Sequence, residues 1–173
     1  NPTVSISGSG DVLAIGNSFN HSGGWVSGHI RIYENYSGVW MQIGQDIDGE
    51  NSYDEIGRSV SLSNNGRIVA FGSYIGEYVS VYQNISGSWT QIGQNINGLS
   101  GEAFGYYVSL NDSGNIVAVG AINNGSNGYH SGQVRVYENI SGSWTQIGQN
   151  IDGEAVGDNS GYTVSLNSNG NIL

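Results

Sequence analysis

The chain has 173 residues, of which 37% are hydrophobic and only 10% carry a charge. Fourteen acidic residues against four arginines and no lysine give a net charge of −10. This charge repels phosphate backbones and anionic lipid surfaces, so it argues against nucleic acid and against direct membrane insertion. There is no cysteine, so no disulfide framework is available.

The first predicted elements are two short strands joined by a tight turn, in the segment VSISGSGDVLAIG that begins at Val4. A variable loop follows, then a third strand in GHIRIYE, a polar turn, and a fourth strand in GVWMQIG. Side chains alternate along these strands as a half-buried sheet requires. Because no segment longer than a few residues has helical periodicity, the chain is predicted to be all-β.

The same four-strand pattern recurs along the chain. Val60, Val108 and Val164 open segments that match the one at Val4, and NISGSWTQIGQNI occurs identically at 84–96 and 139–151. Four short antiparallel strands in a repeat of about fifty residues are typical of a β-propeller blade, which buries its faces against neighbouring blades. We therefore predict tandem four-stranded antiparallel β-propeller-type blades, three repeats plus a partial fourth. The predicted units are 1–59, 60–107, 108–163 and 164–173, and because the last stops inside a predicted strand, we expect a longer array or continuation by another copy.

Asn-x-Ser sequences lie between the third and fourth strands of every repeat, at Asn35, Asn84 and Asn139. Asn20, Asn111 and Asn124 fit the pattern Asn-x-Ser/Thr as well. These positions are suitable acceptors for N-linked glycans in a secreted protein. Asn-x-Ser-Gly is also good turn chemistry, so the two interpretations stay open.

Acidic residues cluster in the loop after the fourth strand, at Asp46, Asp48 and Glu50. Asp152, Glu154 and Asp158 partly repeat this set. The alternating spacing is similar to the first half of a calcium loop and makes Ca²⁺ a candidate ligand. The glycine comes too early and no later bidentate glutamate follows, so a solvated loop is the favoured interpretation.

Two loops are longer than their counterpart in the second repeat: residues 17–28, with Trp25, and residues 122–132, with Tyr129. Long loops at one end of such an array often carry binding residues, and these aromatic side chains suit a glycan or a protein ligand. A glycine-rich loop whose aromatic residue packs locally is the favoured interpretation, and ligand binding is the alternative.

Catalytic patterns are absent from the sequence. There is no cysteine nucleophile, and His29 is matched by Tyr78 and Gln133 in the other repeats. No Ser/His/Asp or metal-histidine spacing stands out, so the sequence predicts that the protein is not an enzyme.

The segment FGYYVSLNDSGNIVAVGA at 104–121 resembles the FG-GAP repeat of integrin α-chain propellers and of microbial and algal surface proteins. Phe104-Gly105 and Val119-Gly120-Ala121 stand where the family has its two motifs. The resemblance implies an extracellular β-propeller used in adhesion or ligand binding, often with calcium in a loop inside the blade. Here that loop is reduced to short turns such as Asp112-Ser113-Gly114, which supply too few oxygen ligands.

Repetition and resemblance together predict a function. The first hypothesis is an extracellular, glycosylated cell-surface scaffold or filament, assembled with further repeats or other copies of the chain. The alternative is an adhesion module, a propeller that binds a glycan or protein ligand.

Overall fold

The computed structural model describes residues 2–173, and these residues form fourteen strands and no helix. Consequently none of them belongs to a helix of the length and apolarity that a membrane crossing requires. The prediction of an all-β chain is confirmed. The strands form three separate antiparallel sheets, none of which closes on itself.

Each sheet contains the four strands that the sequence predicts. The first sheet consists of β1 (Pro2–Ile6), β2 (Val12–Asn17), β3 (His29–Tyr36), β4 (Val39–Gln42) and the short β5 (Ile47–Asp48). The second consists of β6 (Ser59–Leu62), β7 (Ile68–Ser73), β8 (Tyr78–Ile85), β9 (Ser88–Gln91) and the short β10 (Ile96–Asn97). The third consists of β11 (Phe104–Leu110), β12 (Ile116–Ala121), β13 (Gln133–Ile140) and the long β14 (Ser143–Asp152).

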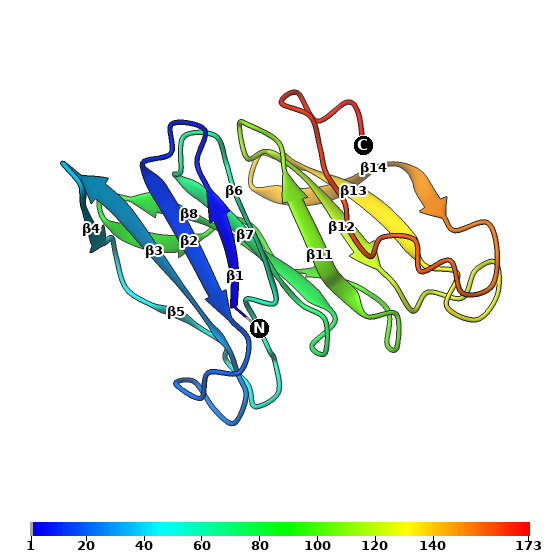
Figure 1. The fold of residues 1–173 in the computed structure, drawn as a ribbon. Helices are drawn as coiled ribbons and strands as arrows, with labels where there is room; N and C mark the ends of the chain where they lie inside the picture. The colour runs from blue at the N-terminus through cyan, green and yellow to red at the C-terminus, as the bar shows by residue number, and fades with distance from the viewer. Residues whose placement is uncertain (1) are drawn as a thin grey trace.

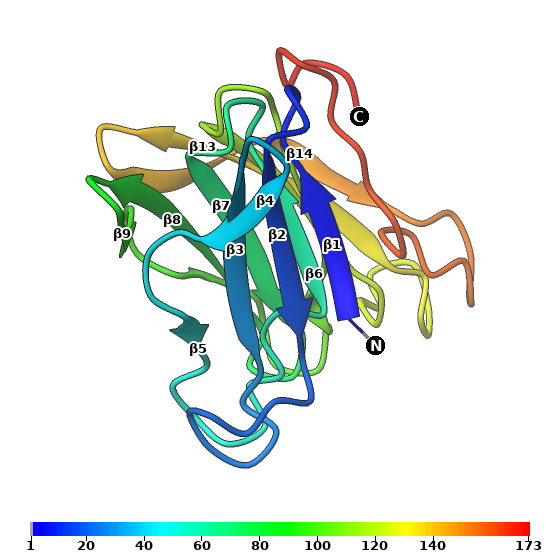
Figure 2. The ribbon, with the colours of Figure 1, turned by 60° about the vertical axis from the view of Figure 1, so that its left-hand side comes forward.

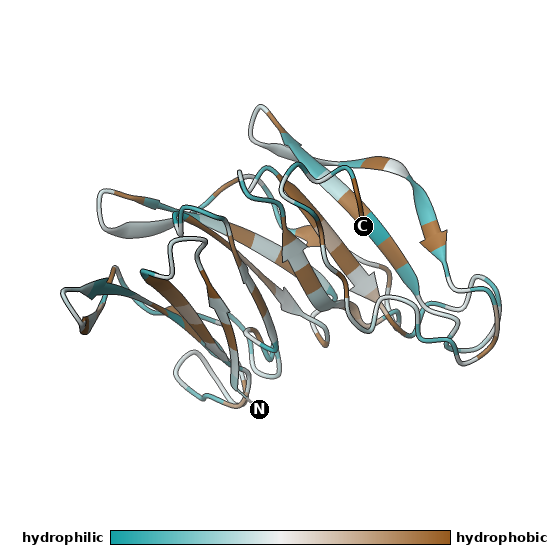
Figure 3. Cartoon of the chain, turned by 45° about the horizontal axis from the view of Figure 1, so that its top comes forward, coloured by the Kyte–Doolittle hydropathy of each residue, from teal (hydrophilic) through white to brown (hydrophobic). Residues whose placement is uncertain are grey.

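The sheets stand one behind another in chain order (Figures 1 and 2), and their first strands, β1, β6 and β11, run along the same edge of the stack. Hydrophobic positions lie mainly on the strands, where they alternate with less hydrophobic ones (Figure 3). One core cluster joins the first sheet to the second, around Ile30, Val60 and Trp89. The other joins the second to the third, around Val79, Val108 and Trp144. The core of the protein is therefore the pair of interfaces between sheets.

The repeated thirteen-residue segment supplies the polar contacts of these interfaces. Trp89 Nε1 donates to the carbonyl oxygen of Ile43 in the preceding sheet at 2.9 Å. The side chain of Gln45 bonds the backbone of the same tryptophan twice. Gln45 Nε2 donates to the carbonyl oxygen of Trp89 at 2.7 Å, and the backbone N–H of Trp89 donates to Gln45 Oε1 at 3.1 Å. Trp144 makes the same bonds to Ile92 and Gln94. The copy at 84–96 makes both kinds of contact: its Trp89 packs on the preceding sheet, and its Ile92 and Gln94 receive Trp144 of the next.

Close backbone contact explains the repeated glycines of the predicted FG and GAP motifs. A Cβ on Gly72 would lie 1.9 Å from the carbonyl oxygen of Gly105 in the next sheet. Gly105 itself has a φ of 84°, which side chains rarely adopt. The pairs Gly16 with Gly57 and Gly120 with Gly161 repeat this contact. Packing between sheets therefore accounts for these sequences without any family relationship.

The predicted strands of the partial fourth repeat are not formed, since residues 164–173 contain no strand. A turn remains, with bonds from Asn167 N to Ile172 O at 3.1 Å and from Gly170 N to Asn167 O. This segment is attached to the third sheet by a bond from Leu166 N to Ser109 Oγ at 3.0 Å. The boundaries of the four predicted units stay a prediction.

Candidate functional site

A pocket of about 440 Å³ opens at the edge formed by the first strands. Its lining comes from β1, the loop after β2, the residue before β6, β11 and the segment after β14. Its lining is polar and aromatic: Thr3, Ser18, Phe19, Arg58, Tyr106, Tyr107, Tyr162 and Thr163. The edge position follows from the stacking, because equivalent strand ends of successive sheets lie next to one another.

Three of the lining side chains occupy the same place in successive repeats. Arg58, Tyr106 and Tyr162 each directly follow the glycine that contacts the preceding sheet. The sequence analysis missed these residues. The signal available in the sequence was the residue that follows the repeated glycine. It is Arg in one repeat and Tyr in the other two, although the neighbouring residues are similar in all three.

Arg58 is held between two aromatic rings, with its guanidinium carbon 4.7 Å from the ring centre of Tyr74 and 4.5 Å from that of Tyr106. Its Nη2 donates to the hydroxyl of Tyr106 at 2.8 Å. Cation–π contacts of this kind fix the plane of the guanidinium. Most of its five N–H donors still lack a protein acceptor in the described residues.

Tyr106 is placed by an irregularity in β11. The pairing of β11 with β12 shifts register between Phe104 and Tyr107, so that Tyr106 falls in a bulge. Bulges re-aim side chains and occur often beside functional sites. The ring of Tyr106 lies 5.2 Å from that of Tyr162.

The hydroxyl of Tyr106 is more acidic than an ordinary phenol. Burial alone would raise its pKa, but hydrogen bonds with Tyr162 and Arg58 and the charge of Arg58 favour the phenolate. The pKa of Tyr106 is therefore lowered.

The pocket differs in charge from the rest of the molecule. Arg58 is its one charged lining residue. In residues 2–173 the two ion pairs are Arg31 with Asp46 and Arg135 with Glu102, so Arg58 forms no ion pair with a carboxylate of these residues. An uncompensated guanidinium beside aromatic rings and hydroxyl groups can bind a small anion that also carries hydroxyls or a ring.

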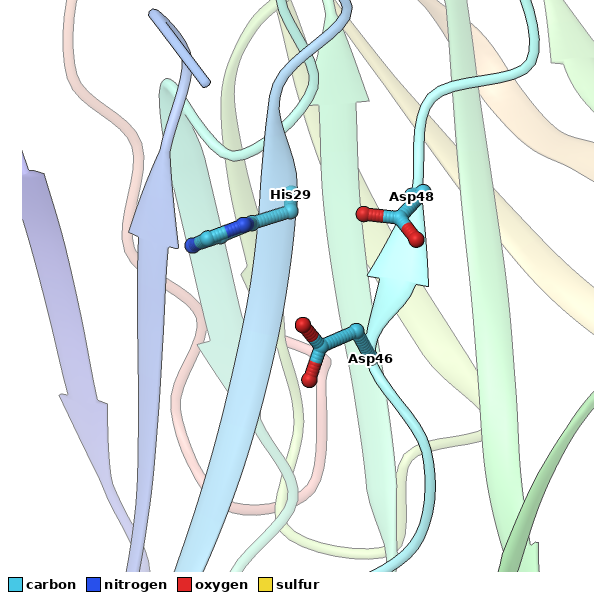
Figure 4. A group of neighbouring side chains, drawn as sticks. All are labelled: His29, Asp46 and Asp48. Atoms are coloured by element: carbon cyan, nitrogen blue, oxygen red, sulfur yellow. The ribbon is translucent and has the colours of Figure 1, made fainter. Parts of the chain in front are cut away.

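A second cluster comprises His29, Asp46 and Asp48 (Figure 4), which offer ligand atoms within 4.8 Å of one another. His29 and Asp48 are paired across β3 and β5. Burial, followed by the charge of Arg31, lowers the pKa of His29, and its Nδ1 is buried without a partner. Both carboxylate oxygens of Asp46 are already bonded, Oδ2 to Arg31 and Oδ1 to Gln42.

This cluster brings together two of the six predicted metal ligands. Three side chains supply too few oxygen atoms for calcium, which takes six to eight. Among residues 2–173, no such group includes Glu50, Asp152, Glu154 or Asp158. Asp158 instead accepts a bond from the amide of Ala155. Calcium binding stays a prediction. The involvement of His29 was missed because the other repeats carry Tyr or Gln there.

The three in-register asparagines cap their turns. The side-chain oxygens of Asn35, Asn84 and Asn139 each accept a bond from the glycine amide three residues on, at 2.7, 3.0 and 2.9 Å. Nδ2, to which a glycan would be attached, is buried in Asn84 and Asn139. The turn interpretation therefore describes this trio, and glycosylation stays untested.

The other asparagines also take part in local hydrogen bonds. Asn20 Oδ1 accepts from the amide of Ser22. Asn111 and Asn124 are buried, and their Nδ2 atoms donate to Ser113 and Glu102 respectively.

The two predicted binding aromatics lie outside the pocket. Trp25 and Tyr129 are exposed, and each ring lies tilted against that of a nearby histidine, with ring centres 4.7 Å apart for His21 and 4.0 Å apart for His130. The structure thus places them against their own loops, and their role in binding stays a prediction.

The fold and the pocket define an all-β protein of stacked antiparallel sheets with a cationic, aromatic pocket at one edge. No protein-family model matches the sequence, and a comparison with curated proteins finds no match. Solved structures are similar in fold. A protein from Bacteroides fragilis, provisionally described as a 6-phosphogluconolactonase, matches with a TM-score of 0.61 at 13% identity, over 88% of this chain and 38% of its own.

A second such protein, from Bacteroides uniformis, has a TM-score of 0.58 at 13% identity, over 86% of this chain and 41% of its own. Hydrazine synthase of Kuenenia stuttgartiensis has a TM-score of 0.59 at 11% identity, over 96% of this chain and 39% of its own. The chain therefore spans well under half the length of these proteins. Identities this low show a shared fold alone.

These comparisons correct the family expectation. The resemblance to FG-GAP repeats is wrong, because no such family matches and the similar structures belong to lactonase-like and other proteins. The motifs are short and glycine-rich, and in this chain the contact between sheets requires these glycines.

The functional expectation is also corrected. The predicted roles as an extracellular glycosylated scaffold or filament, and as an adhesion module, are wrong, since the similar structures include proteins described as enzymes. The same two structures, described as 6-phosphogluconolactonases, stand against the expectation that the chain is not an enzyme. Their 13% identity shows a shared fold alone, so that expectation stays a prediction. A location at the cell surface stays a prediction that neither fold nor comparison tests.

Proposed function

We propose that the pocket around Arg58 binds a small anionic metabolite, such as a sugar phosphate or sugar acid, in an array of β-propeller-type blades. The observation that carries the proposal is the unpaired guanidinium of Arg58 in a pocket without carboxylates. Arginine binds phosphate and carboxylate through parallel N–H donors. Tyr107, Thr3 and Ser18 offer hydroxyls for the sugar.

The volume of the pocket and the arrangement of the sheets both fit the proposed ligand. A pocket of about 440 Å³ suits a single metabolite rather than a polymer. The blade arrangement is supported by three antiparallel sheets of five, five and four strands, stacked face to face with their first strands along one edge. Two similar structures carry the description 6-phosphogluconolactonase, which makes a phosphorylated sugar acid the first ligand to test.

Calorimetric titration with 6-phosphogluconate, gluconate, glucose 6-phosphate and glucose tests the proposal. The three anions are expected to bind and neutral glucose to bind far more weakly. Arg58→Gln should weaken anion binding at least about tenfold, and Arg58→Lys less, because it keeps the charge but loses the planar fork. Arg67→Gln is the matched control, since Arg67 is an exposed arginine outside the pocket. Equal binding of glucose and its phosphate, or no loss in Arg58→Gln, would refute the proposal.

A second candidate function is hydrolysis of a cyclic ester, favoured by the lowered pKa of Tyr106 next to Arg58. The phenolate would act as general base toward water, and the guanidinium would stabilise the oxyanion that forms on the carbonyl. Acid release from a sugar lactone, compared between the wild type and Tyr106→Phe, tests it. A rate equal to that of the buffer alone would exclude it.

A further inference from the structure

The loop between β7 and β8 is the shortest of three equivalent loops. It comprises residues 74–77, whereas residues 18–28 join β2 to β3 and residues 122–132 join β12 to β13. In each long loop, two backbone carbonyl groups accept hydrogen bonds from amides of the segment that follows the sheet. The bonds run from Glu55 N to Val26 O, from Ile56 N to Ser27 O, from Asn159 N to His130 O and from Ser160 N to Ser131 O.

In the short loop the side chain of Glu77 takes the place of these carbonyl groups. Its Oε2 accepts a hydrogen bond from the amide of Phe104 at 2.7 Å. Its Oε1 accepts from the amides of Gly101 at 3.0 Å and of Ala103 at 3.2 Å. Bonds from amides to a carboxylate are stronger than those to a neutral carbonyl group. Because Tyr106 follows directly after this segment, Glu77 fixes the backbone that leads to the pocket.

The other end of the short loop is anchored to the segment that leads to Arg58. Ser73, the last residue of β7, donates from Oγ to the carbonyl group of Asp54. The loop therefore bridges the two segments that carry Arg58 and Tyr106, and Tyr74 is its first residue.

Tyr74 contacts both members of the pair. Its ring centre lies 4.7 Å from the guanidinium carbon of Arg58. The ring centres of Tyr74 and Tyr106 are 5.7 Å apart, and the two ring planes meet at 82°. The two rings thus form a corner, and the guanidinium lies against both of them. Tyr74 does not line the pocket, so it can influence a ligand there only through its neighbours.

The aromatic ring and the arginine occur in the same repeat. The residues equivalent to Tyr74 are Ser18 and Ile122, which are not aromatic, and those repeats have no arginine equivalent to Arg58. A long side chain loses rotamer freedom when it binds a ligand, and a side chain that is already held loses less. A ring against the guanidinium therefore favours binding without touching the ligand.

We propose that Tyr74 is a positioning residue of the pocket, which holds the guanidinium of Arg58 in the orientation that binds the anion. This role rests on the proposed function of the pocket. The short loop is part of the same arrangement, because Ser73 and Glu77 hold its two ends.

Calorimetric titration of the full chain with 6-phosphogluconate gives the first test. Tyr74→Leu should weaken binding about fivefold, as expected for loss of one cation–π contact. Tyr74→Phe keeps the ring and should restore the binding that Tyr74→Leu loses. Ile75→Ala changes an exposed residue of the same loop and is the control.

A double variant separates positioning from a general structural effect. If Tyr74 acts through Arg58, Tyr74→Leu combined with Arg58→Gln should bind no more weakly than Arg58→Gln alone. Losses that add in the double variant would overturn the proposal.

The pKa of Tyr106 gives a readout that needs no ligand. Burial raises this pKa, but hydrogen bonds with Tyr162 and Arg58 and the charge of Arg58 lower it overall. In Tyr74→Leu the guanidinium is freer to leave the Tyr106 hydroxyl, so the pKa of Tyr106 should rise. Carbon NMR of labelled tyrosine Cζ atoms follows the titration, with Tyr106→Phe to assign the signal.

The two readouts distinguish failure of the positioning role from failure of the proposed function. Absence of anion binding in the wild type would refute the function, whereas the NMR titration would still test the contact of Tyr74 with Arg58. A pKa of Tyr106 that is the same in the wild type and in Tyr74→Leu would overturn the positioning role.

Discussion

Arg58 directly precedes β6 of the second sheet and Tyr106 lies in β11 of the third, yet the guanidinium of Arg58 donates to the Tyr106 hydroxyl at 2.8 Å and lies 4.5 Å from the centre of its ring. The contact couples the edge of one sheet to the next at the mouth of the pocket. It also means that the pocket exists only when neighbouring sheets are stacked. Binding at this site and the interface between sheets are therefore linked.

The contact between Gly72 and Gly105 gives the first prediction. Gly72→Ala would put a methyl group 1.9 Å from a backbone oxygen, so the second and third sheets must separate. We expect a loss of about 3 kcal/mol in the free energy of unfolding, measured by urea denaturation. The control is Gly125→Ala, where the nearest atom would be 3.6 Å away. Equal stabilities of the two variants would contradict this packing.

A second prediction compares equivalent tryptophans. Trp89→Ala removes a buried ring and its bond to Ile43, and should cost about 4 kcal/mol. Trp40→Ala should change the stability of the dilute monomer by no more than about 0.5 kcal/mol, because this ring is uncovered. Thermal or urea unfolding at low concentration measures both. Similar losses would show that the first sheet is covered in solution.

The third prediction concerns the buried pair of Glu102 and Arg135, joined at 2.8 Å. Burial alone would raise the pKa of Glu102, but the amide of Leu99 and the guanidinium of Arg135 hold it below the usual 4.5. As the pH falls, Glu102 therefore takes up a proton in the unfolded chain before it does so in the folded chain. The stabilisation that ionised Glu102 gives to the folded state is complete above the pKa of the unfolded chain. It is lost as pH falls through the lower folded pKa. We expect stability to fall as the pH drops below about 4.5.

The pH dependence of stability distinguishes the buried pair of Glu102 and Arg135 from the more exposed pair of Asp46 and Arg31. Glu102→Gln should be less stable at neutral pH, because it leaves Arg135 without its charged partner, and its stability should vary less between pH 5 and 3. Asp46→Asn removes the half-exposed pair with Arg31 and should have a smaller effect, since solvent screens that pair. Identical pH profiles for the wild type and Glu102→Gln would exclude the assigned role.

The fourth prediction distinguishes turn chemistry from glycosylation. Asn35→Ala and Ser37→Ala both destroy the same Asn-x-Ser sequence, but only the first removes the bond from Gly38 N to Asn35 Oδ1. In unglycosylated protein we expect Asn35→Ala to lose about 1 kcal/mol of stability and Ser37→Ala to lose far less. Chemical denaturation of bacterially produced protein measures the difference. Equal losses would show that the capped turn contributes no stability.

The strands of the three sheets were predictable because hydrophobic alternation and repetition agree in each copy. Val4, Val60 and Val108 stand in the same register with their partner strands, as the alignment of the repeats requires. The strands predicted in the fourth repeat are not formed. Alternation of hydrophobic residues indicates only that a segment can pair as a strand, whereas a strand forms only against a partner strand of adequate length.

The pocket was not predictable in the same way. Arg58, Tyr106 and Tyr162 are far apart in the chain, and only the stacking of successive sheets brings them together. Sequence reasoning concentrated on acidic loops and exposed aromatics, which are conspicuous in composition. A functional position in a repeat protein is indicated instead by a residue that differs from its equivalents in the other repeats. Arg58 differs in this way, whereas the glycine before it is the same in every repeat.

The recurrence of one set of contacts at each junction has a genetic consequence. Ser5, Ser61 and Ser109 meet successive amides in the same way, so an added repeat would arrive with its donors and acceptors already matched to both neighbours. Unequal recombination between the near-identical coding segments could therefore lengthen or shorten the gene by whole repeats in a single event. Each product would keep the same serine–amide contact at every junction.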